Sequence, residues 1–278
     1  MRFSPFLRKE LKKIAHDTIS LTLHGIMKNM RKGVPMTLHA FFELHPKAAL
    51  GFSGGVDSAY LLHAAREAGA DVKPYFIKTP FQPAFELEDA KKLAPELTVL
   101  ELDTLKDETI AANPADRCYH CKKALFDALK AQAEQDGYSV LLDGTNASDS
   151  WDDRPGMRAL EELGVLSPLR LCGLTKDEIR RLSKEAGLFT WDKPAYACLA
   201  TRVPTGTTID RETLQNVEAA EAALMELGYR DLRVRIFHGA AQVQLKREQF
   251  PKTDAAYTAI LQAVRPFFEQ VLLDLQGR

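Results

Sequence analysis

The sequence predicts an α/β fold, in which a parallel sheet carries helices on both faces and a small α+β domain follows at the C-terminal end. Three observations support this fold class. Short apolar runs alternate with stretches of helical spacing from Lys47 onward, which is the pattern of a parallel sheet. A glycine turn with the sequence Ser-Gly-Gly-Val-Asp-Ser, at residues 53–58, joins the first apolar run to the first helix. After about residue 206 the order changes to helix, strand, strand, helix, strand.

The composition is that of a globular protein with little net charge. Hydrophobic residues make up 45% of the 278 residues, charged residues make up 27%, and the formal net charge is −1. No apolar run approaches the roughly 18 residues of a membrane span, and no secretory signal with a continuous apolar core is present. Because the chain has no global basic field, a nucleic-acid partner is disfavoured. We expect a cytoplasmic protein without membrane attachment.

Residues 1–35 are basic and weakly patterned, whereas Met36 opens a compact Met-Thr-Leu-His-Ala-Phe-Phe stretch. We assign residues 1–35 to an N-terminal extension and expect a chain that starts at Met36 to fold and keep its activity. A basic targeting segment is the alternative. Residues 36–205 are assigned to a nucleotide-binding domain and residues 206–278 to the C-terminal α+β domain.

The first strand is expected at residues 48–52, an apolar run short enough for one buried strand, and the first helix at 57–68, where apolar residues have helical spacing. The same alternation continues along the chain. Further strands are expected at 72–77, 97–102, 139–143 and 165–169, and further helices at 85–93 and 119–135. Glu86 lies near the start of the helix at 85–93, where the helix dipole favours acidic side chains.

A capping box, Thr175-Lys176-Asp177-Glu178, opens a helix that ends at Gly187. Residues 191–206 then carry two prolines, a cysteine and an arginine without a clear period, which is typical of a functional loop. The C-terminal elements are expected as a helix at 210–227, strands at 232–237 and 241–245 around His238-Gly239, a helix at 254–264 and a strand at 270–275.

The glycine turn at residues 53–58 has the features of a phosphate site. Gly54 and Gly55 permit a tight turn and a close approach of backbone N–H groups to a ligand, and Ser53 and Ser58 add hydroxyl groups. The following helix directs its N-terminus at the same place, where an anion is favoured. No Gly-Lys-Ser/Thr is present, so the turn is not a Walker A loop. The alternative is an ordinary strand-to-helix turn.

The Ser-Gly-Gly-x-Asp-Ser pattern resembles the pyrophosphate loop of the PP-loop ATP pyrophosphatases. That resemblance implies cleavage of ATP between the α and β phosphates and adenylation of a substrate. The expected fold is then the parallel sheet of that class. Asp57 would belong to the nucleotide site, with Mg²⁺ offsetting the charge of the leaving pyrophosphate.

A second polar segment follows the strand expected at 139–143. It includes Gly144, Thr145 and Asn146, small and polar residues that can meet a nucleotide from the side opposite the glycine turn. A charged turn that contains Arg154 continues it. Because ligands of parallel sheets bind at the carboxyl ends of the strands, we expect this segment beside the glycine turn. A polar surface loop is the alternative.

Two cysteines, Cys118 and Cys121, form a C-x-x-C pair at the start of the helix expected at 119–135. Such a pair can bind a metal or a cluster, or form a redox disulfide. The helix N-terminus and Lys122 are expected to lower the pKa values of both thiols. Alternatively, both are small buried apolar residues.

Cys198, on the loop at 191–206, would complete a site of three thiolates with the C-x-x-C pair. An iron–sulfur cluster would use the three thiolates and keep one iron open, and zinc would use them together with water. Cys172, next to Gly173 after an apolar stretch, is expected to be structural. Four cysteines in a chain of this length do not indicate a disulfide scaffold.

Arg233 and Arg235 lie two positions apart on an expected strand and therefore share one face. Two guanidinium groups on one face could hold a phosphate. A solvated strand face is an equally good interpretation. The seven histidines show no spacing of metal ligands.

Taken together, several motifs resemble the LarE family, the PP-loop sulfur transferases that build the nickel-pincer nucleotide cofactor. The resemblance covers roughly residues 38–278. It rests on the glycine turn, on residues 143–149, on Asp153-Arg154-Pro155-Gly156, on residues 191–206, and on Arg233-Val234-Arg235 with His238-Gly239. It implies ATP-dependent adenylation of a carboxylate on a pyridinium dicarboxylate mononucleotide, after which sulfur replaces the activated oxygen.

The resemblance also implies roles for the loop at 191–206. Cys198 would lie near the activated carbonyl as nucleophile or cluster ligand, and Arg202 would stabilise charge near the adenylate. In one branch of the family the cysteine gives up its own sulfur and becomes dehydroalanine. In the other, that cysteine and a C-x-x-C pair hold a 4Fe–4S cluster, and the three cysteines here are similar to that branch. We further expect a sulfur donor and a homo-oligomer.

One departure from the family pattern concerns the strand after His238-Gly239. The family usually shows Ala-Arg-Ile-Glu there, whereas this chain has Ala-Gln-Val-Gln, so that Gln244 stands at an acidic position. Two other functions stay open. A tRNA thiolase would share the glycine turn and three cysteines but would have a basic surface, and a non-catalytic nucleotide-binding module would not need three cysteines.

Overall fold

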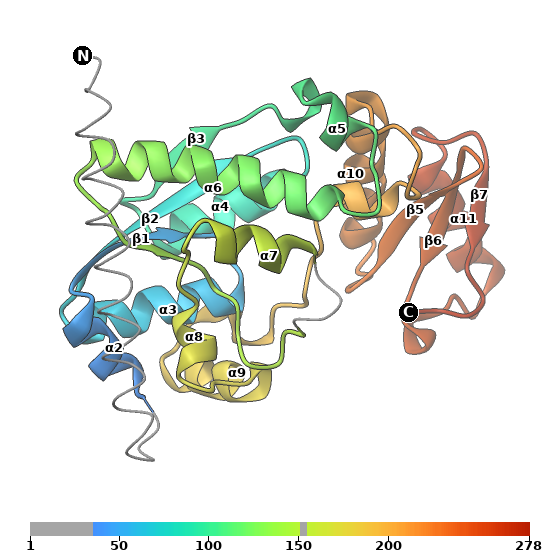
Figure 1. The fold of residues 1–278 in the computed structure, drawn as a ribbon. Coiled ribbons are helices and arrows are strands. Elements are labelled where there is room, and N and C mark those ends of the chain that lie inside the picture. Colours follow the sequence, from blue (N-terminus) through green and yellow to red (C-terminus); the bar gives the residue numbers. More distant parts are fainter. Residues whose placement is uncertain (1–35, 151–154) are drawn as a thin grey trace.

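The computed structural model describes residues 36–150 and 155–278. The N-terminal extension and Arg154 therefore lie outside the described residues. A four-stranded sheet with the order β3-β2-β1-β4 forms the centre of the first part, and all of its strand pairs are parallel (Figure 1). Its strands are β1 (Lys47–Gly51), β2 (Asp71–Lys78), β3 (Thr98–Glu101) and β4 (Leu141–Leu142).

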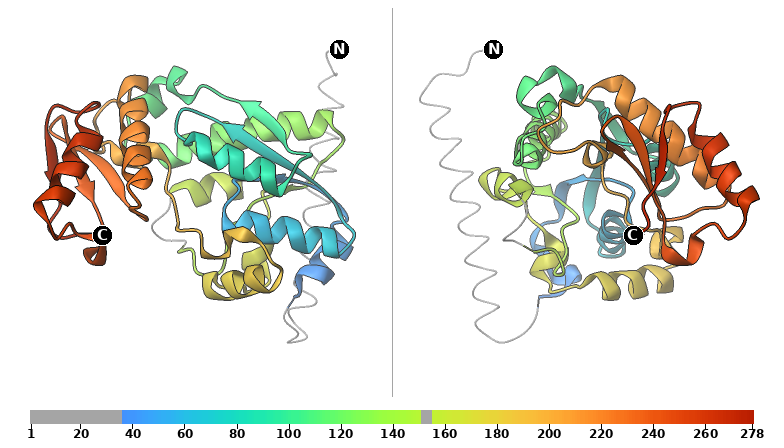
Figure 2. Two further views of the ribbon diagram at one scale, coloured as in Figure 1. Left: turned by 180° about the vertical axis from the view of Figure 1, so that it is seen from behind. Right: turned by 90° about the vertical axis from the view of Figure 1, so that its right-hand side faces the viewer.

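Helices cover both faces of this sheet, as the fold-class prediction requires (Figures 1 and 2). Neighbouring residues of β1 alternate between the two sides, because successive side chains of a strand point in opposite directions. Leu50 packs in a cluster with α2 (Leu38–Leu44) and α3 (Val56–Glu67), whereas Ala49 packs in a cluster with α6 (Arg117–Gln135) and α7 (Pro155–Glu162). The other helices of this part are α4 (Ala84–Leu93), α5 (Glu108–Ala111), α8 (Pro168–Leu171) and α9 (Lys176–Glu185).

The prediction of a fifth strand at 165–169 is wrong. Leu166 forms only an isolated parallel bridge with Leu142, and the chain then enters the short helix α8. Pro168 explains the difference, because proline lacks the N–H that a strand ladder uses but suits the first turn of a helix.

The C-terminal elements follow the expected order. They are α10 (Arg211–Glu226), β5 (Arg233–Phe237), β6 (Ala240–Gln244), α11 (Asp254–Val264) and β7 (Val271–Leu273). The β5–β6 pair is antiparallel, and the β6–β7 pair is parallel. His238 and Gly239, which join β5 to β6, both have positive φ angles (51° and 83°), as a tight hairpin turn requires.

One buried cluster joins the second sheet to α10 and α11. It also contains Phe81, Ile110 and Leu199 from the preceding part of the chain. The C-terminal elements therefore pack against the carboxyl end of the first sheet, while the boundary at residue 206 stays a prediction. Among the residues that the structure describes, no helix combines the length and the hydrophobicity needed to cross a bilayer.

Candidate functional site

The glycine turn lies between β1 and α3, as expected. Gly54 has a φ of +70°, and a Cβ at this position would lie 3.0 Å from the backbone nitrogen and the Cβ of Ala90 in α4. The turn therefore needs glycine both for its backbone conformation and for close packing. The Oγ atoms of Ser53 and Ser58 are 3.2 Å apart, and Gly55, the N-cap of α3, provides no side chain to cap the helix. The N-terminus of α3 is thus left available to an anion.

The segment after β4 lies against this turn. A Cβ at Gly144 would lie 3.1 Å from the backbone nitrogen of Ser58, so the two chain segments are in direct contact. Thr145 and Asn146 are both buried beside it. The Asp143 carboxylate accepts hydrogen bonds from Thr145 and, at 2.6 Å, from Ser167. The structure therefore brings Gly144, Thr145 and Asn146 to the edge that carries the glycine turn.

Asp57, in the first turn of α3, has one carboxylate oxygen paired and one unpaired. Its Oδ2 lies 2.5 Å from the Nζ atom of Lys176, while Oδ1 is buried and has no hydrogen-bond partner in the described part of the chain. Burial raises the pKa of Asp57, and Lys176 opposes the rise. A buried carboxylate oxygen without a donor beside a phosphate cradle fits the oxygen ligands that Mg²⁺ prefers.

Lys176 is a site residue that the sequence prediction missed. The capping box of α9 already explained its position, and its partner Asp57 lies 119 residues earlier. Its backbone N–H also donates to Ser148 Oγ at 3.0 Å. Lys176 thus ties the start of α9 to both polar segments of the site.

Three thiols from two distant segments lie close together. Cys118 and Cys121 belong to the first turns of α6, and Cys198 is the N-cap of the 3₁₀ turn at Leu199–Arg202. Burial raises the pKa of Cys121 to about 12, and the neighbouring thiols Cys198 and Cys118 add to the rise. Burial also raises the pKa of Cys198, against the opposing charge of Arg117. Lowered thiol pKa values were therefore the wrong expectation for Cys121, because burial outweighs the nearby cations.

The three thiols supply the donor chemistry of a cluster but do not stand as a metal site. Between residues 36 and 278, with 151–154 left aside, no group of three or more His, Cys, Asp or Glu side chains has the arrangement that holds a metal ion. Cys118 is exposed, whereas Cys121 and Cys198 are half-buried against the apolar cluster of the C-terminal elements. Cys172 is also half-buried and packs against the apolar cluster that contains Leu50, α2 and α3, in keeping with a structural role.

Of the four arginines of the predicted site, the three that the structure describes, Arg202, Arg233 and Arg235, bind within the protein. Arg202 is fully buried, and its Nε atom lies 2.7 Å from Glu221 Oε1. Arg233 is also buried and donates to the Ala195 carbonyl at 2.5 Å. Burial, together with the charge of Arg202, lowers the pKa of Arg233 to about 10. A solvated face was therefore the wrong alternative for Arg233, and Arg202 is not a surface cation.

Gln244, which stands at the usual acidic position, links two charged residues. Its Oε1 accepts a hydrogen bond from Arg235 Nε at 2.8 Å, and its Nε2 donates to Asp274 Oδ2 at 2.8 Å. A glutamate could not donate to Asp274 in this way, so the amide suits its neighbours. Arg235 also donates to the Thr201 carbonyl at 2.6 Å, next to Arg202.

Glu86 is a second acidic group that the sequence prediction did not assign to the site. It lies on α4 one turn before Ala90, the residue that packs against Gly54. Burial raises the pKa of Glu86 to about 7, although Lys193, Lys78 and Arg202 oppose the rise. Its carboxylate makes no direct ion pair or hydrogen bond with another described residue, because the neighbouring lysines bind elsewhere: Lys193 to Asp89 (2.8 Å) and Lys78 to the Gln82 carbonyl (2.8 Å).

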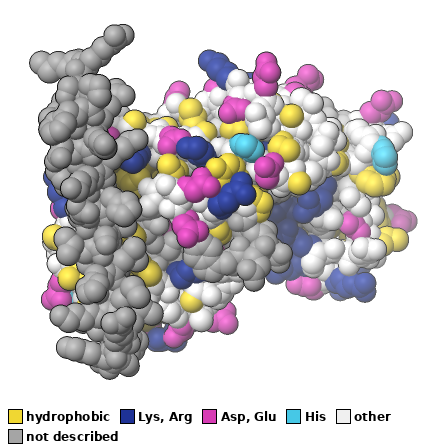
Figure 3. Space-filling view, viewed as in Figure 1, with side chains coloured by type: hydrophobic (Ala, Val, Ile, Leu, Met, Phe, Trp, Pro, Cys, Tyr) yellow, Lys and Arg dark blue, Asp and Glu magenta, His cyan; other side chains and the backbone are white. Residues whose placement is uncertain are grey.

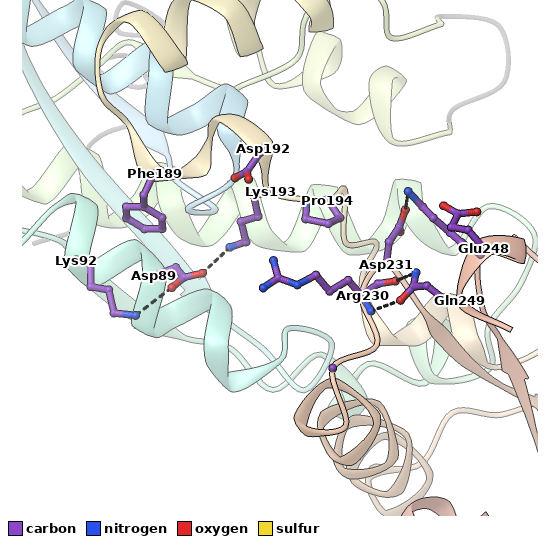
Figure 4. A pocket seen from close by; sticks show the side chains of 12 residues that line it. Asp89, Lys92, Phe189, Asp192, Lys193, Pro194, Arg230, Asp231, Glu248 and Gln249 are labelled. Atoms are coloured by element: carbon purple, nitrogen blue, oxygen red, sulfur yellow. Dashed lines mark hydrogen bonds and ion pairs between the residues drawn. The ribbon is translucent and has the colours of Figure 1, made fainter. Parts of the chain in front are cut away.

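Basic side chains gather between the two parts of the molecule. Figure 3 shows Lys and Arg side chains in the hollow between the α6–α7 face and the C-terminal sheet. A separate open pocket of about 880 Å³ is lined by residues of α4, of the segment 189–194 and of the C-terminal part (Figure 4). Neither the glycine turn nor any of the three thiols lines that pocket, so it is distinct from the candidate site.

Comparison with known proteins places this chain in a family. No protein-family profile matches the chain. The chain is 34% identical over 215 residues to pyridinium-3,5-bisthiocarboxylic acid mononucleotide synthase of Lactiplantibacillus plantarum, covering 75% of this chain and 78% of that protein. It is 36% identical over 248 residues to an uncharacterised protein of Synechocystis, covering 86% of this chain and 92% of that one.

A more distant relative shares the fold. The tRNA-specific 2-thiouridylase of Thermotoga petrophila is 22% identical over 188 residues, which is 51% of this chain and 52% of that protein. The identity to the synthase and the coverage of both chains are sufficient to assign the family. This chain belongs to the LarE family of pyridinium-3,5-bisthiocarboxylic acid mononucleotide synthases.

Proposed function

We propose that this protein adenylates a carboxylate of a pyridinium dicarboxylate mononucleotide with ATP and then replaces the activated oxygen with sulfur. The observation that carries this function is the position of α4. Ala90 of α4 packs on the glycine turn, while Phe85 of the same helix stacks edge-on against Tyr196, two residues before Cys198 (ring centroids 5.0 Å apart). The phosphate cradle and the Cys198 loop are therefore held on one short helix.

Different residues of the predicted site serve the two steps, adenylation and sulfur transfer. The carboxylate oxygen of the substrate attacks the α phosphorus of ATP, and the pyrophosphate that leaves is held by the turn at 53–58 and by the N-terminus of α3. Gly144, Thr145 and Asn146 border the nucleotide on the other side. Asp57 would hold Mg²⁺, which supplies positive charge to the phosphates when it is bound. The sulfur nucleophile then attacks the acyl carbon, and AMP leaves with the activated oxygen.

The basic hollow favours an anionic acceptor of this kind. Arg233 and Arg235 belong to β5 of the C-terminal sheet, where they donate to backbone carbonyls, and they would add positive charge near the acceptor phosphate. Arg154 is proposed for the same nucleotide site on sequence grounds alone. Adenylation of the substrate is assigned to the domain of residues 36–205, and residues 206–278 are assigned to the smaller α+β domain. A cytoplasmic homo-oligomer with a separate sulfur donor is part of the same proposal, and the net charge of −1 disfavours a tRNA acceptor.

Sulfur enters this scheme at the three neighbouring thiols. Cys118, Cys121 and Cys198 have the donor chemistry of an iron–sulfur cluster, and their side chains would rearrange to hold a 4Fe–4S cluster, which would supply replaceable sulfur when it is bound. The alternative is sacrifice of the Cys198 sulfur itself. The two routes differ in the mass of the protein after reaction.

The test combines product analysis with protein mass. Protein purified without oxygen is supplied with ATP, Mg²⁺, the dicarboxylate mononucleotide and sulfide as the sulfur donor, and is expected to form AMP, pyrophosphate and a thiocarboxylate. We expect the mass of the protein to stay unchanged, and Cys118→Ala to lose iron and activity, while the control Cys172→Ala keeps both. Dehydroalanine at position 198 with full activity in Cys118→Ala would reject the cluster. Formation of ADP and phosphate would reject the function itself.

The shape of the glycine turn gives a further prediction, for which the chain offers a matched control. Gly54→Ala and Gly69→Ala both place a side chain at a φ of +70°, but only the Cβ at Gly54 meets atoms within 4 Å. Each variant is expected to lose about 1–2 kcal/mol of unfolding free energy through backbone strain. Only Gly54→Ala should also lose pyrophosphate release, because its Cβ displaces the turn from α4. Equal activity in the two variants would contradict the proposed phosphate cradle.

A further inference from the structure

The segment around Cys198, which we call the cysteine arch (residues 195–202), is held by arginine side chains from outside and inside the segment. Five of its backbone carbonyls accept hydrogen bonds from guanidinium groups. These bonds run from Arg233 to Ala195 (2.5 Å), from Arg202 to Ala197 (3.1 Å) and Cys198 (3.4 Å), from Arg117 to Ala200 (3.0 Å), and from Arg235 to Thr201 (2.6 Å). Charge-assisted hydrogen bonds are stronger than neutral ones, so these five stabilise the observed conformation of the irregular backbone.

A single buried carboxylate holds both sides of the arch. Glu221, in α10, is 1% exposed and accepts hydrogen bonds from Arg202 Nε at 2.7 Å and from Arg202 Nη2 at 3.1 Å. It also accepts from the hydroxyl of Tyr196 and, at 2.8 Å, from the backbone N–H of Val234 in β5. Tyr196 and Arg202 flank Cys198 in the sequence, so one carboxylate fixes the chain on both sides of the thiol.

The surroundings of Glu221 show that this position is not an ordinary surface acid. It lies on the buried side of α10, whose neighbours on that side are Val217 and Leu224, where an apolar residue would be expected. A buried carboxylate is stable there only because donors satisfy it, and Arg202 supplies the compensating charge. Two guanidinium groups contact the ring of Tyr196: that of Arg202 lies 4.8 Å from the ring centroid and that of Arg233 lies 4.9 Å from it.

We propose that Glu221 is a positioning residue for Cys198: by binding Tyr196 and Arg202 it fixes the arch and so holds the Cys198 sulfur in one position. This proposal rests on the proposed function, in which Cys198 serves the sulfur-transfer step either as a cluster ligand or as the source of the sulfur. It also makes Arg202 a positioning residue, because every nitrogen of its guanidinium group already donates a hydrogen bond within the arch or to Glu221.

The first test compares Glu221→Gln with Glu226→Gln, the same change at an exposed position of the same helix. The amide keeps the size of the side chain but removes the charge and one acceptor. Glu221→Gln is expected to lower kcat for sulfur transfer by about 100-fold, since a displacement of about 1 Å has an effect of that size, with KM for ATP unchanged. Glu221→Asp, which keeps the charge, should recover part of kcat. Glu226→Gln should equal the parent.

Hydrogen–deuterium exchange of the full-length protein reports on the arch independently of the reaction. In Glu221→Gln the peptide that contains residues 195–202 should exchange faster, and the peptide that contains residues 53–58 should not change. If Glu221→Gln does not fold, the double variant Glu221→Gln/Arg202→Gln removes both buried charges and should fold with the same local change. A folded variant with parental kcat or parental exchange of the arch overturns the proposal. Failure of the proposed function would instead appear as a parent that transfers no sulfur.

Discussion

Replacing Asp57 with asparagine is expected to lower the rate of pyrophosphate release by about 100- to 1,000-fold, the range seen when one charge-stabilising group is removed from an active site. The unpaired Oδ1 of Asp57 is buried beside the glycine turn, and its charge is what would attract a cation that offsets the phosphates. Asparagine keeps the volume and removes the charge. The measurement is pyrophosphate release at saturating ATP and Mg²⁺ in the presence of the acceptor.

A matched control exists at the amino ends of the strands in the same sheet, opposite to the glycine turn. Asp71 begins β2 and accepts a hydrogen bond from Tyr138 at 2.9 Å, so Asp71→Asn makes the same chemical change far from the turn. We expect Asp71→Asn to retain the parental rate. Parental activity in Asp57→Asn would show that this carboxylate does not serve the phosphates. Equal losses in both variants would point to a loss of folded protein.

Replacing Glu86 with glutamine is expected to stabilise the protein at alkaline pH. The pKa of Glu86 in the folded state, about 7, lies above its ordinary value of 4.5, so the folded protein binds this proton more tightly than the unfolded chain does. The stability that follows is present below about pH 4.5 and is lost as the pH rises through 7. At pH 8 Glu86→Gln should therefore be more stable than the parent by up to about 3 kcal/mol, at 1.36 kcal/mol for each pKa unit.

Urea unfolding at pH 5 and pH 8 measures this effect. Glu88, on the exposed side of the same helix, gives the control Glu88→Gln. The difference in unfolding free energy between Glu86→Gln and the parent should grow with pH, while that between Glu88→Gln and the parent should stay constant. A constant difference for both variants would show that the Glu86 carboxylate is not destabilised by burial.

The backbone pattern of the fold could be predicted from sequence, because it depends on local periodicity. The strands at 48–52 and 72–77 and the capping box at Thr175 reflect neighbours within a few residues, and the structure confirms them. The false strand at 165–169 shows the limit. Its apolar residues suit a strand, but Pro168 cannot join the ladder, and this local fact outweighs the pattern.

The site was predicted in its motifs but not in its contacts. The residue types of the glycine turn and of the cysteines indicate their chemistry. The roles of Lys176, Glu86 and Glu221 depend instead on neighbours in space that lie far away in the sequence. Only Glu221 left a usable signal, as an acid on the apolar side of a helix. For Glu86 the sequence pointed the wrong way, because the helix dipole favours a charged acid while burial disfavours one.

The strand order of the first sheet has a consequence for how the protein folds. β1, β2 and β3 are neighbours both in sequence and in space, so each pairing closes only a short loop. β4 instead returns to the free side of β1 after roughly ninety residues, and such distant contacts form late because the entropy of loop closure is lost before they contribute. The glycine turn and Gly144 lie at this β1–β4 junction. We therefore expect the β1–β4 pairing, and with it the phosphate site, to form after the β1–β2 and β2–β3 pairings, and a nucleotide bound there would stabilise this long-range contact.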